Sequence, residues 1–206
     1  MVRAYVRRFP FETDGKVYPE ERERYIASSR HPKRREESFH VWKLLEQLIS
    51  DSTGRDMSSY PISRKGYKWS VEGLEISLSH TGNHAAAIVS DAEKVGIDIE
   101  FVSERFTDRM AERVLYKDAR ETYRSITDDN EKRRFLCMYW TGLEAIFKAT
   151  GKDRKRRDIS EYLPFLRTFY ADTGDGTLIC SVYSEEETTP ILITDGDKVP
   201  LTLCRK

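Results

Sequence analysis

The sequence predicts an α+β fold built from two halves of about 100 residues each. Strand-like and helix-like patterns follow one another in the order strand, helices, strands, and then helices and strands again. The length of 206 residues suits one large domain or two small ones. With 38% hydrophobic and 11% aromatic residues, the chain can form a proper core. We expect the halves, residues 1–102 and 103–206, to join near Glu100–Ser103.

The first half begins with a strand at residues 2–8, where apolar and polar residues alternate. A helical pattern runs from Pro19 to Ser50, and Pro32 divides it into two helices. Residues 50–66 are rich in Ser, Gly and Pro and indicate a loop. Three short strands are then expected at 74–79, 84–90 and 94–100, with a tight turn at Thr81-Gly82-Asn83 between the first two.

The second half begins with helical segments that run roughly over residues 105–125. Another helix is expected from Asp128, whose side chain can cap it with Glu131 three residues later, to Thr150. The remainder is strand-like at 166–171, 177–183, 190–195 and 199–204.

The charge balance argues against a dedicated nucleic-acid binder, because 35 basic residues match 35 acidic ones. Two basic clusters, His31–Glu36 and Gly151–Asp158, are either solvated surfaces or places to hold a phosphate. The three cysteines are far apart and form no CxxC, so neither a disulfide framework nor a zinc site is indicated. Without an apolar leader or an 18-residue apolar run, we expect a soluble, cytoplasmic protein.

The stretch "VGIDIE" places two carboxylates on one side of a strand. Val95, Ile97 and Ile99 form its buried side, while Asp98 and Glu100 project together from the other. Adjacent carboxylates repel unless they share a cation, and oxygen ligands so spaced suit Mg²⁺. Alternatively, the strand simply ends in solvent with two charges.

The stretch "SLSHTG" places Ser79 and His80 at the end of a strand before a tight turn. A hydroxyl and an imidazole at a turn can donate to a phosphate, although such a histidine is more often packed or solvated. His80 and His84 do not form a zinc site, because Gly82-Asn83 breaks any helix between them.

The stretch "YWTGLEAIFKATGK" carries Glu144 and Lys148 four residues apart on one face of a helix. An ordinary surface ion pair of this spacing contributes only about 0.3–0.5 kcal/mol. Any other role for this pair needs partners elsewhere in the chain.

In this order, the three stretches resemble the 4′-phosphopantetheinyl transferases, specifically the larger, two-lobed type. The resemblance is clear from about Leu74 to Lys152 and extends more weakly to the helix at 33–50. It implies two similar α+β lobes in a pseudo-twofold arrangement, with an active site between them. The implied reaction transfers 4′-phosphopantetheine from coenzyme A to a serine of an apo acyl or peptidyl carrier protein. The implied enzyme is a monomer that uses Mg²⁺.

The resemblance also implies roles for individual residues. Asp98, Glu100 and Glu144 would hold Mg²⁺, and Glu144 would be the general base. Lys148 would lie against the coenzyme A pyrophosphate. The expected coenzyme A contacts are completed by Ser79, His80, Lys65, Arg34 and Arg35.

Two departures from the family pattern bear on activity. Leu143 stands where the family has a lysine, and Gly151-Lys152-Asp153-Arg154 replaces the usual Gly-Lys-Gly-Leu. We expect Lys152, Arg154 and Lys155 to compensate for the missing cation. Two alternatives stay open. One is a degenerate member that binds coenzyme A or a carrier protein without transfer. The other is a carboxylate–lysine nuclease, disfavoured by the helical spacing of Glu144 and Lys148.

Overall fold

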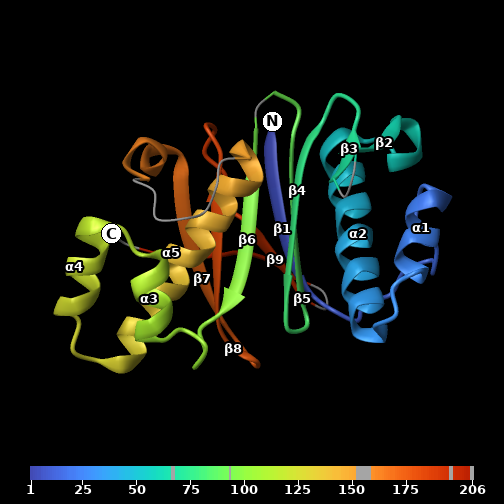
Figure 1. The fold of residues 1–206 in the computed structure, drawn as a ribbon. Helices are drawn as coiled ribbons and strands as arrows, with labels where there is room; N and C mark the ends of the chain where they lie inside the picture. Colours follow the sequence, from blue (N-terminus) through green and yellow to red (C-terminus); the bar gives the residue numbers. More distant parts are fainter. Residues whose placement is uncertain (66–67, 93, 152–158, 195–196, 205–206) are drawn as a thin grey trace.

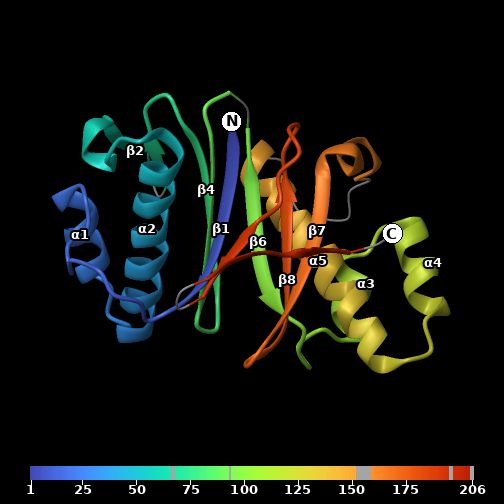
Figure 2. The ribbon, with the colours of Figure 1, turned by 180° about the vertical axis from the view of Figure 1, so that it is seen from behind.

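The computed structural model describes residues 1–65, 68–92, 94–151, 159–194 and 197–204 and has a mixed α+β fold (Figures 1 and 2). This mixture confirms the predicted fold class. The elements of the first part are β1 (Val2–Arg8), α1 (Glu20–Ala27), α2 (Pro32–Thr53), η1 (Met57–Ser59), β2 (Ile62–Lys65), β3 (Lys68–Val71), β4 (Glu75–Thr81), β5 (His84–Ser90) and β6 (Gly96–Phe101). Those that follow are α3 (Asp108–Val114), α4 (Lys117–Ser125), α5 (Asp129–Thr150), η2 (Ser160–Phe165), β7 (Leu166–Thr173), β8 (Gly176–Tyr183), β9 (Ile191–Ile193), β10 (Lys198–Pro200) and β11 (Thr202–Leu203).

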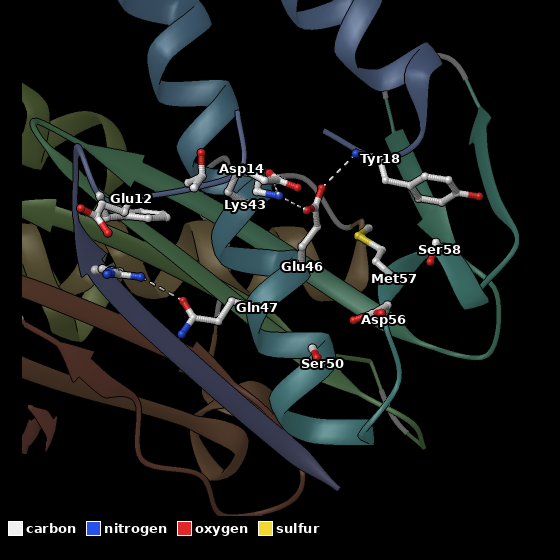
Figure 3. A pocket seen from close by; sticks show the side chains of 13 residues that line it. Glu12, Asp14, Tyr18, Lys43, Glu46, Gln47, Ser50, Asp56, Met57 and Ser58 are labelled. Carbon is white, nitrogen blue, oxygen red and sulfur yellow. Dashed lines mark hydrogen bonds and ion pairs between the residues drawn. The ribbon is translucent and has the colours of Figure 1, made fainter. Parts of the chain in front are cut away.

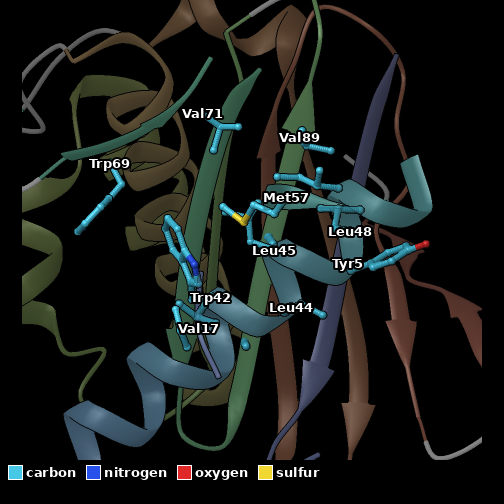
Figure 4. Packing of buried hydrophobic residues seen from close by; sticks show 14 of the residues in the cluster. Tyr5, Val17, Trp42, Leu44, Leu45, Leu48, Met57, Trp69, Val71 and Val89 are labelled. Carbon is cyan, nitrogen blue, oxygen red and sulfur yellow. The ribbon is translucent and has the colours of Figure 1, made fainter. Parts of the chain in front are cut away.

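A five-stranded sheet in the order β10-β9-β1-β5-β4 carries helix α2 on one face. The 22-residue helix buries its apolar stripe, including Trp42, Leu45 and Leu48, against Ala87 and Val89 of β5 (Figure 4). Each of these five side chains is fully buried. The apolar spacing that predicted a helix therefore also determines which face packs on the sheet.

A four-stranded sheet in the order β11-β7-β8-β6 carries helix α5, also 22 residues long. The two sheets pack against each other through a shared apolar cluster, in which Val6 and Ile88 of the first meet Ile97, Ile99 and Val182 of the second. The layers are therefore α2, the five-stranded sheet, the four-stranded sheet and α5. Figures 1 and 2 show α2 and α5 on opposite sides of the molecule.

Strand pairing connects the two halves of the sequence in both directions. Strand β6, which precedes residue 102, pairs with β8, and β9 pairs in parallel with β1. The hydrogen-bonded sheets therefore do not separate at residue 102. The division into two domains at that residue remains a prediction.

Most expected elements are confirmed, including the cap of α5, where the Asp128 carboxylate accepts a hydrogen bond from Glu131 N–H at 2.8 Å. The helical segments expected at 105–125 are confirmed as two helices, α3 and α4, because the fully buried Leu115 adopts an extended conformation between them.

The loop expected at 50–66 is wrong in part. Helix α2 continues to Thr53, and β2 forms a hairpin with β3, whose Trp69 and Val71 are buried in the core under α2. The strand expected at 199–204 is two short strands in different sheets, separated by the buried Leu201. Among the described residues, no helix has the length and apolar character needed to cross a membrane.

Candidate active site

Strand β6 presents Asp98 and Glu100 on the side opposite its core residues, as its alternation predicts. Ile97 and Ile99 are buried between the sheets, while Asp98 is only 7% exposed on the other side, because α5 packs there. Both carboxylates therefore face a helix. The side chain of Glu100 is 15% exposed. The alternative of a strand that simply ends in solvent does not describe this arrangement.

Gly96 allows α5 to approach β6 this closely. A Cβ atom at this position would lie 1.9 Å from the carbonyl oxygen of Ala145 and 3.1 Å from the backbone nitrogen of Ala149. Contacts so short are not tolerated, so only glycine fits. The two alanines lie on α5 beside Glu144 and Lys148, and this close approach brings both side chains to the acidic strand.

Lys148 joins α5 to the edges of both sheets. Its ammonium donates to Asp98 Oδ1 at 2.8 Å and to the carbonyl oxygens of Leu78 and Ile97, each at 2.9 Å. An ammonium has three hydrogens, and these bonds account for all of them. In this arrangement Lys148 neutralises Asp98 and bridges β4 to β6. Its expected contact with a pyrophosphate remains a prediction.

Hydroxyl groups of β4 form a second link between the edges of the two sheets. Ser79 Oγ donates to Asp98 Oδ1 at 2.7 Å and accepts from Ile99 N–H at 3.3 Å. Ser77 Oγ accepts from Ile97 N–H at 3.1 Å. The side chains thus satisfy backbone groups of β6 that a neighbouring strand would otherwise satisfy. The single hydroxyl hydrogen of Ser79 is used by Asp98, and its expected contact with a phosphate remains a prediction.

Glu100 has partners that sequence reasoning missed. Thr81 donates to its Oε1 at 2.5 Å, and Arg105 lies 2.5 Å from its Oε2. Arg105 is half exposed, and its side chain also lies over the Phe106 ring. In sequence, nothing distinguishes Arg105 from the other basic residues that follow β6.

Glu144 is 7% exposed and lies on α5 one turn before Lys148. Carboxylate oxygens are the ligands that Mg²⁺ prefers, so the donor types of Asp98, Glu100 and Glu144 fit this ion. Among the residues that the structure describes, however, no three acidic, histidine or cysteine side chains are close enough to hold a metal ion. Lys148 and Arg105 supply positive charge to the strand carboxylates instead. The three-carboxylate magnesium site remains a prediction.

A cavity of about 490 Å³ lies between α1, α2 and the end of β4. Arg34, Glu37 and His80 line it together with Tyr25, Ile26, Ser28, Ser29 and Ser38. Burial lowers the pKa of His80, and the Glu37 carboxylate opposes this effect. The structure thus brings together two residues predicted to bind coenzyme A, Arg34 and His80.

The other predicted cationic contacts are placed less closely. Arg35 is exposed on α2 and does not line this cavity in the described residues. Lys65 lies in β2, and its side chain is not among those described. The compensating cluster of Lys152, Arg154 and Lys155 lies outside the described residues.

A larger cavity of about 610 Å³ lies beside α2 and η1, and within the described part of the chain none of the predicted site residues lines it (Figure 3). Three of its ionic groups contact one another: Lys43 lies 2.9 Å from Asp14 and also contacts Glu46, whose Oε1 accepts from Tyr18 N–H at 3.0 Å. Burial raises the pKa of Glu46, and Lys43 opposes that shift. The chemistry points to the β6–α5 contact and the smaller cavity beside it.

Two comparisons with known proteins bear on the part of the chain that carries β6 and α5. The 4′-phosphopantetheinyl transferase HetI of Nostoc sp. (strain PCC 7120 / SAG 25.82 / UTEX 2576) is 33% identical over 87 residues, which are 42% of this chain and 36% of HetI. The matched part thus spans little more than a third of that relative. A family model of the 4′-phosphopantetheinyl transferase superfamily matches residues 94–204, a stretch that includes β6 and α5 with Asp98, Glu100, Glu144 and Lys148. Since this match covers more than half of the chain, the protein belongs to the 4′-phosphopantetheinyl transferase superfamily.

Proposed function

We propose that this protein transfers 4′-phosphopantetheine from coenzyme A to a serine of an apo acyl or peptidyl carrier protein. The observation that carries the proposal is the close packing of α5 on β6, which gathers the acidic strand and Lys148 within the part of the chain that the family model matches. In the reaction, the serine oxygen forms a bond to the phosphorus nearer the pantetheine. The bond from that phosphorus to the bridging oxygen breaks, and adenosine 3′,5′-bisphosphate leaves.

The chain's own residues would bind coenzyme A at the end of β4. Arg34 and His80 line one cavity, and its cationic and donor groups suit phosphate oxygens. Lys65 and Arg35 would add charge at this end, and Ser79 would lie beside the same phosphates. Lys148 lies one turn from Glu144, at the junction of β4 and β6, where it would provide fixed positive charge near the pyrophosphate.

Glu144 would accept the proton of the attacking serine, directly or through a water molecule. Such a proton transfer contributes roughly 10²–10⁴-fold to the rate. Asp98, Glu100 and Glu144 would hold Mg²⁺, which when bound neutralises charge on the pyrophosphate. We further propose that the enzyme has two lobes, is a monomer and acts in the cytoplasm.

Intact-mass spectrometry of the carrier protein tests the proposal. We would incubate the protein with an apo acyl-carrier protein, coenzyme A and Mg²⁺, with and without EDTA. We expect a gain of one phosphopantetheine, lost with EDTA and reduced about 10²–10⁴-fold in Glu144→Gln. Glu131→Gln is the matched control, because Glu131 lies exposed on the same helix.

The opposite outcome would identify a different function. If several unrelated carriers gain no mass while coenzyme A binds measurably, the protein binds without transfer. Cleavage of nucleic acid by the same preparation, abolished in Glu144→Gln, would instead support the nuclease alternative.

A further inference from the structure

Glu37 is a buried carboxylate in a cavity that is proposed to bind an anion. It lies on α2, is 9% exposed, and lines the 490 Å³ cavity with Arg34 and His80. A carboxylate repels phosphate and is costly to bury without a partner. Its presence at this position therefore requires a compensating interaction.

The Glu37 carboxylate lies close to two cationic or titratable side chains, and His80 is the less exposed of the two. Glu37 Oε2 lies 3.6 Å from His80 Nδ1, and Oε1 lies 3.9 Å from the ammonium of Lys33. The side chain of Lys33 is 73% exposed, and such exposed pairs contribute little. His80 is 43% exposed and lies in β4, so its contact with Glu37 links two separate elements across the cavity.

The contact with Glu37 determines which ring nitrogen of His80 carries a hydrogen toward it. A carboxylate only accepts hydrogen bonds, so Glu37 favours a hydrogen on Nδ1 of His80. The other ring nitrogen, Nε2, lies on the opposite side of the ring from Nδ1. Lys148, Asp98 and Glu100 are the other charged groups that act on His80, from α5 and β6, while Glu37 is the carboxylate with the largest effect.

We infer that Glu37 is a positioning residue, which holds the Nδ1 edge of His80 so that Nε2 can donate to a phosphate of coenzyme A. This inference rests on the proposed function and concerns the same cavity. Glu37 need not touch the substrate to act, because its effect passes through the imidazole. Sequence reasoning gave no indication of it, since the pairing joins residues on α2 and β4.

A double-mutant cycle measured by calorimetry tests the inference. The probe is adenosine 3′,5′-bisphosphate, whose binding requires neither transfer nor a carrier protein. We expect Glu37→Gln to weaken binding about tenfold in the otherwise unchanged protein, as expected for one hydrogen bond to a charged group. In the His80→Ala background the same substitution should not weaken binding, because Glu37 then has no imidazole to position.

Two further variants separate positioning from folding. Glu37→Asp should recover part of the affinity, and Lys33→Met, which removes the other contact, should leave it unchanged. Urea unfolding of each variant verifies that the protein is folded. In the transfer assay, Glu37→Gln should raise the KM for coenzyme A. Its rate at saturating coenzyme A, kcat, should be unchanged.

Equal weakening in both backgrounds, or tighter binding of Glu37→Gln beside an intact His80, would overturn the inference alone. A protein that transfers phosphopantetheine but shows either result keeps its proposed function. If the unchanged protein shows no transfer and does not bind the bisphosphate, both the inference and the proposed function are overturned.

Discussion

His40 packs among three phenylalanines on the side of α2 that contacts the chain after β1. Its ring stacks on Phe9 at 5.0 Å and contacts Phe11 and Phe39, and its Nδ1 has no hydrogen-bond partner among the described residues. Burial lowers the pKa of His40 below its ordinary value of 6.5. The folded protein therefore favours a neutral ring at this position.

This environment predicts a loss of stability in mild acid. As the pH falls below about 6.5, the unfolded chain binds a proton at this histidine before the folded protein does, so the free energy of unfolding decreases. We expect His40→Phe to reduce this dependence, measured by urea unfolding at pH 7.5 and 5.5. Part of the pH dependence should remain in this variant, because burial also lowers the pKa values of His80 and His84.

The exposed His31 supplies the control for that measurement. His31→Gln should leave the pH dependence of unfolding unchanged. An undiminished dependence in His40→Phe would show that His40 does not contribute to it.

Leu143 occupies the position where the family has a lysine, and it is 4% exposed on α5. Restoring the family residue therefore introduces a charge into a buried position. We expect Leu143→Lys to lower the free energy of unfolding by about 1–3 kcal/mol, and we expect no gain in transfer rate. Leu203→Lys, at a position 53% exposed, should change stability by less than about 0.5 kcal/mol. A stable and faster Leu143→Lys would show instead that the lysine reaches the site.

At the scale of elements, the contact between β6 and α5 depends on one missing side chain. Gly96→Ala would place a methyl group against the backbone of α5 at Ala145, so the helix must move away. We expect a loss of at least about 1–3 kcal/mol, the usual cost of overpacking, together with loss of transfer activity. Urea unfolding and the carrier mass assay measure the two effects.

Gly174 is the matched control for that substitution, because a Cβ added there would meet no atom within 4 Å. Gly174→Ala should leave both activity and stability unchanged. Full activity in Gly96→Ala would mean that α5 does not need this close approach to function.

Elements with regular periods were predictable from sequence. The apolar stripe of α2 and the alternation of β6 both gave the correct buried face, because local periodicity determines which side chains share a face. The hairpin of β2 and β3 was not predictable, since its strands are short and their order comes from packing Trp69 and Val71 under α2.

The candidate site was likewise predictable only where a local sequence pattern determines it. Alternation alone placed Asp98 and Glu100 on one side, whereas the roles of Glu144 and Lys148 came from a family resemblance. The hydrogen bonds from Lys148 to Leu78 and Ile97, and the contact of Glu37 with His80, join elements that are distant in sequence. Such contacts depend on tertiary packing and leave no local pattern.

At the scale of the whole molecule, the five-stranded sheet needs residues from near both ends of the described chain. Leu192 of β9 pairs with Val6 of β1 and Val199 of β10. Leu192→Pro removes a backbone donor inside the sheet, and we expect a loss of about 1–3 kcal/mol. The midpoint of urea unfolding measures it. Val199→Ala, at an exposed position of edge strand β10, should have little effect, and an equal effect of both would contradict the role of β9 pairing.

The parallel pairing of β1 with β9 also has a consequence for biosynthesis. A ribosome makes β1 before the other described elements and β9 after most of them, so one edge of β1 has no partner while most of the chain is translated. Unpaired strand edges bind other extended chains. We therefore expect nascent chains stalled before residue 190 to be more prone to capture by chaperones, or to aggregation, than chains released after residue 200.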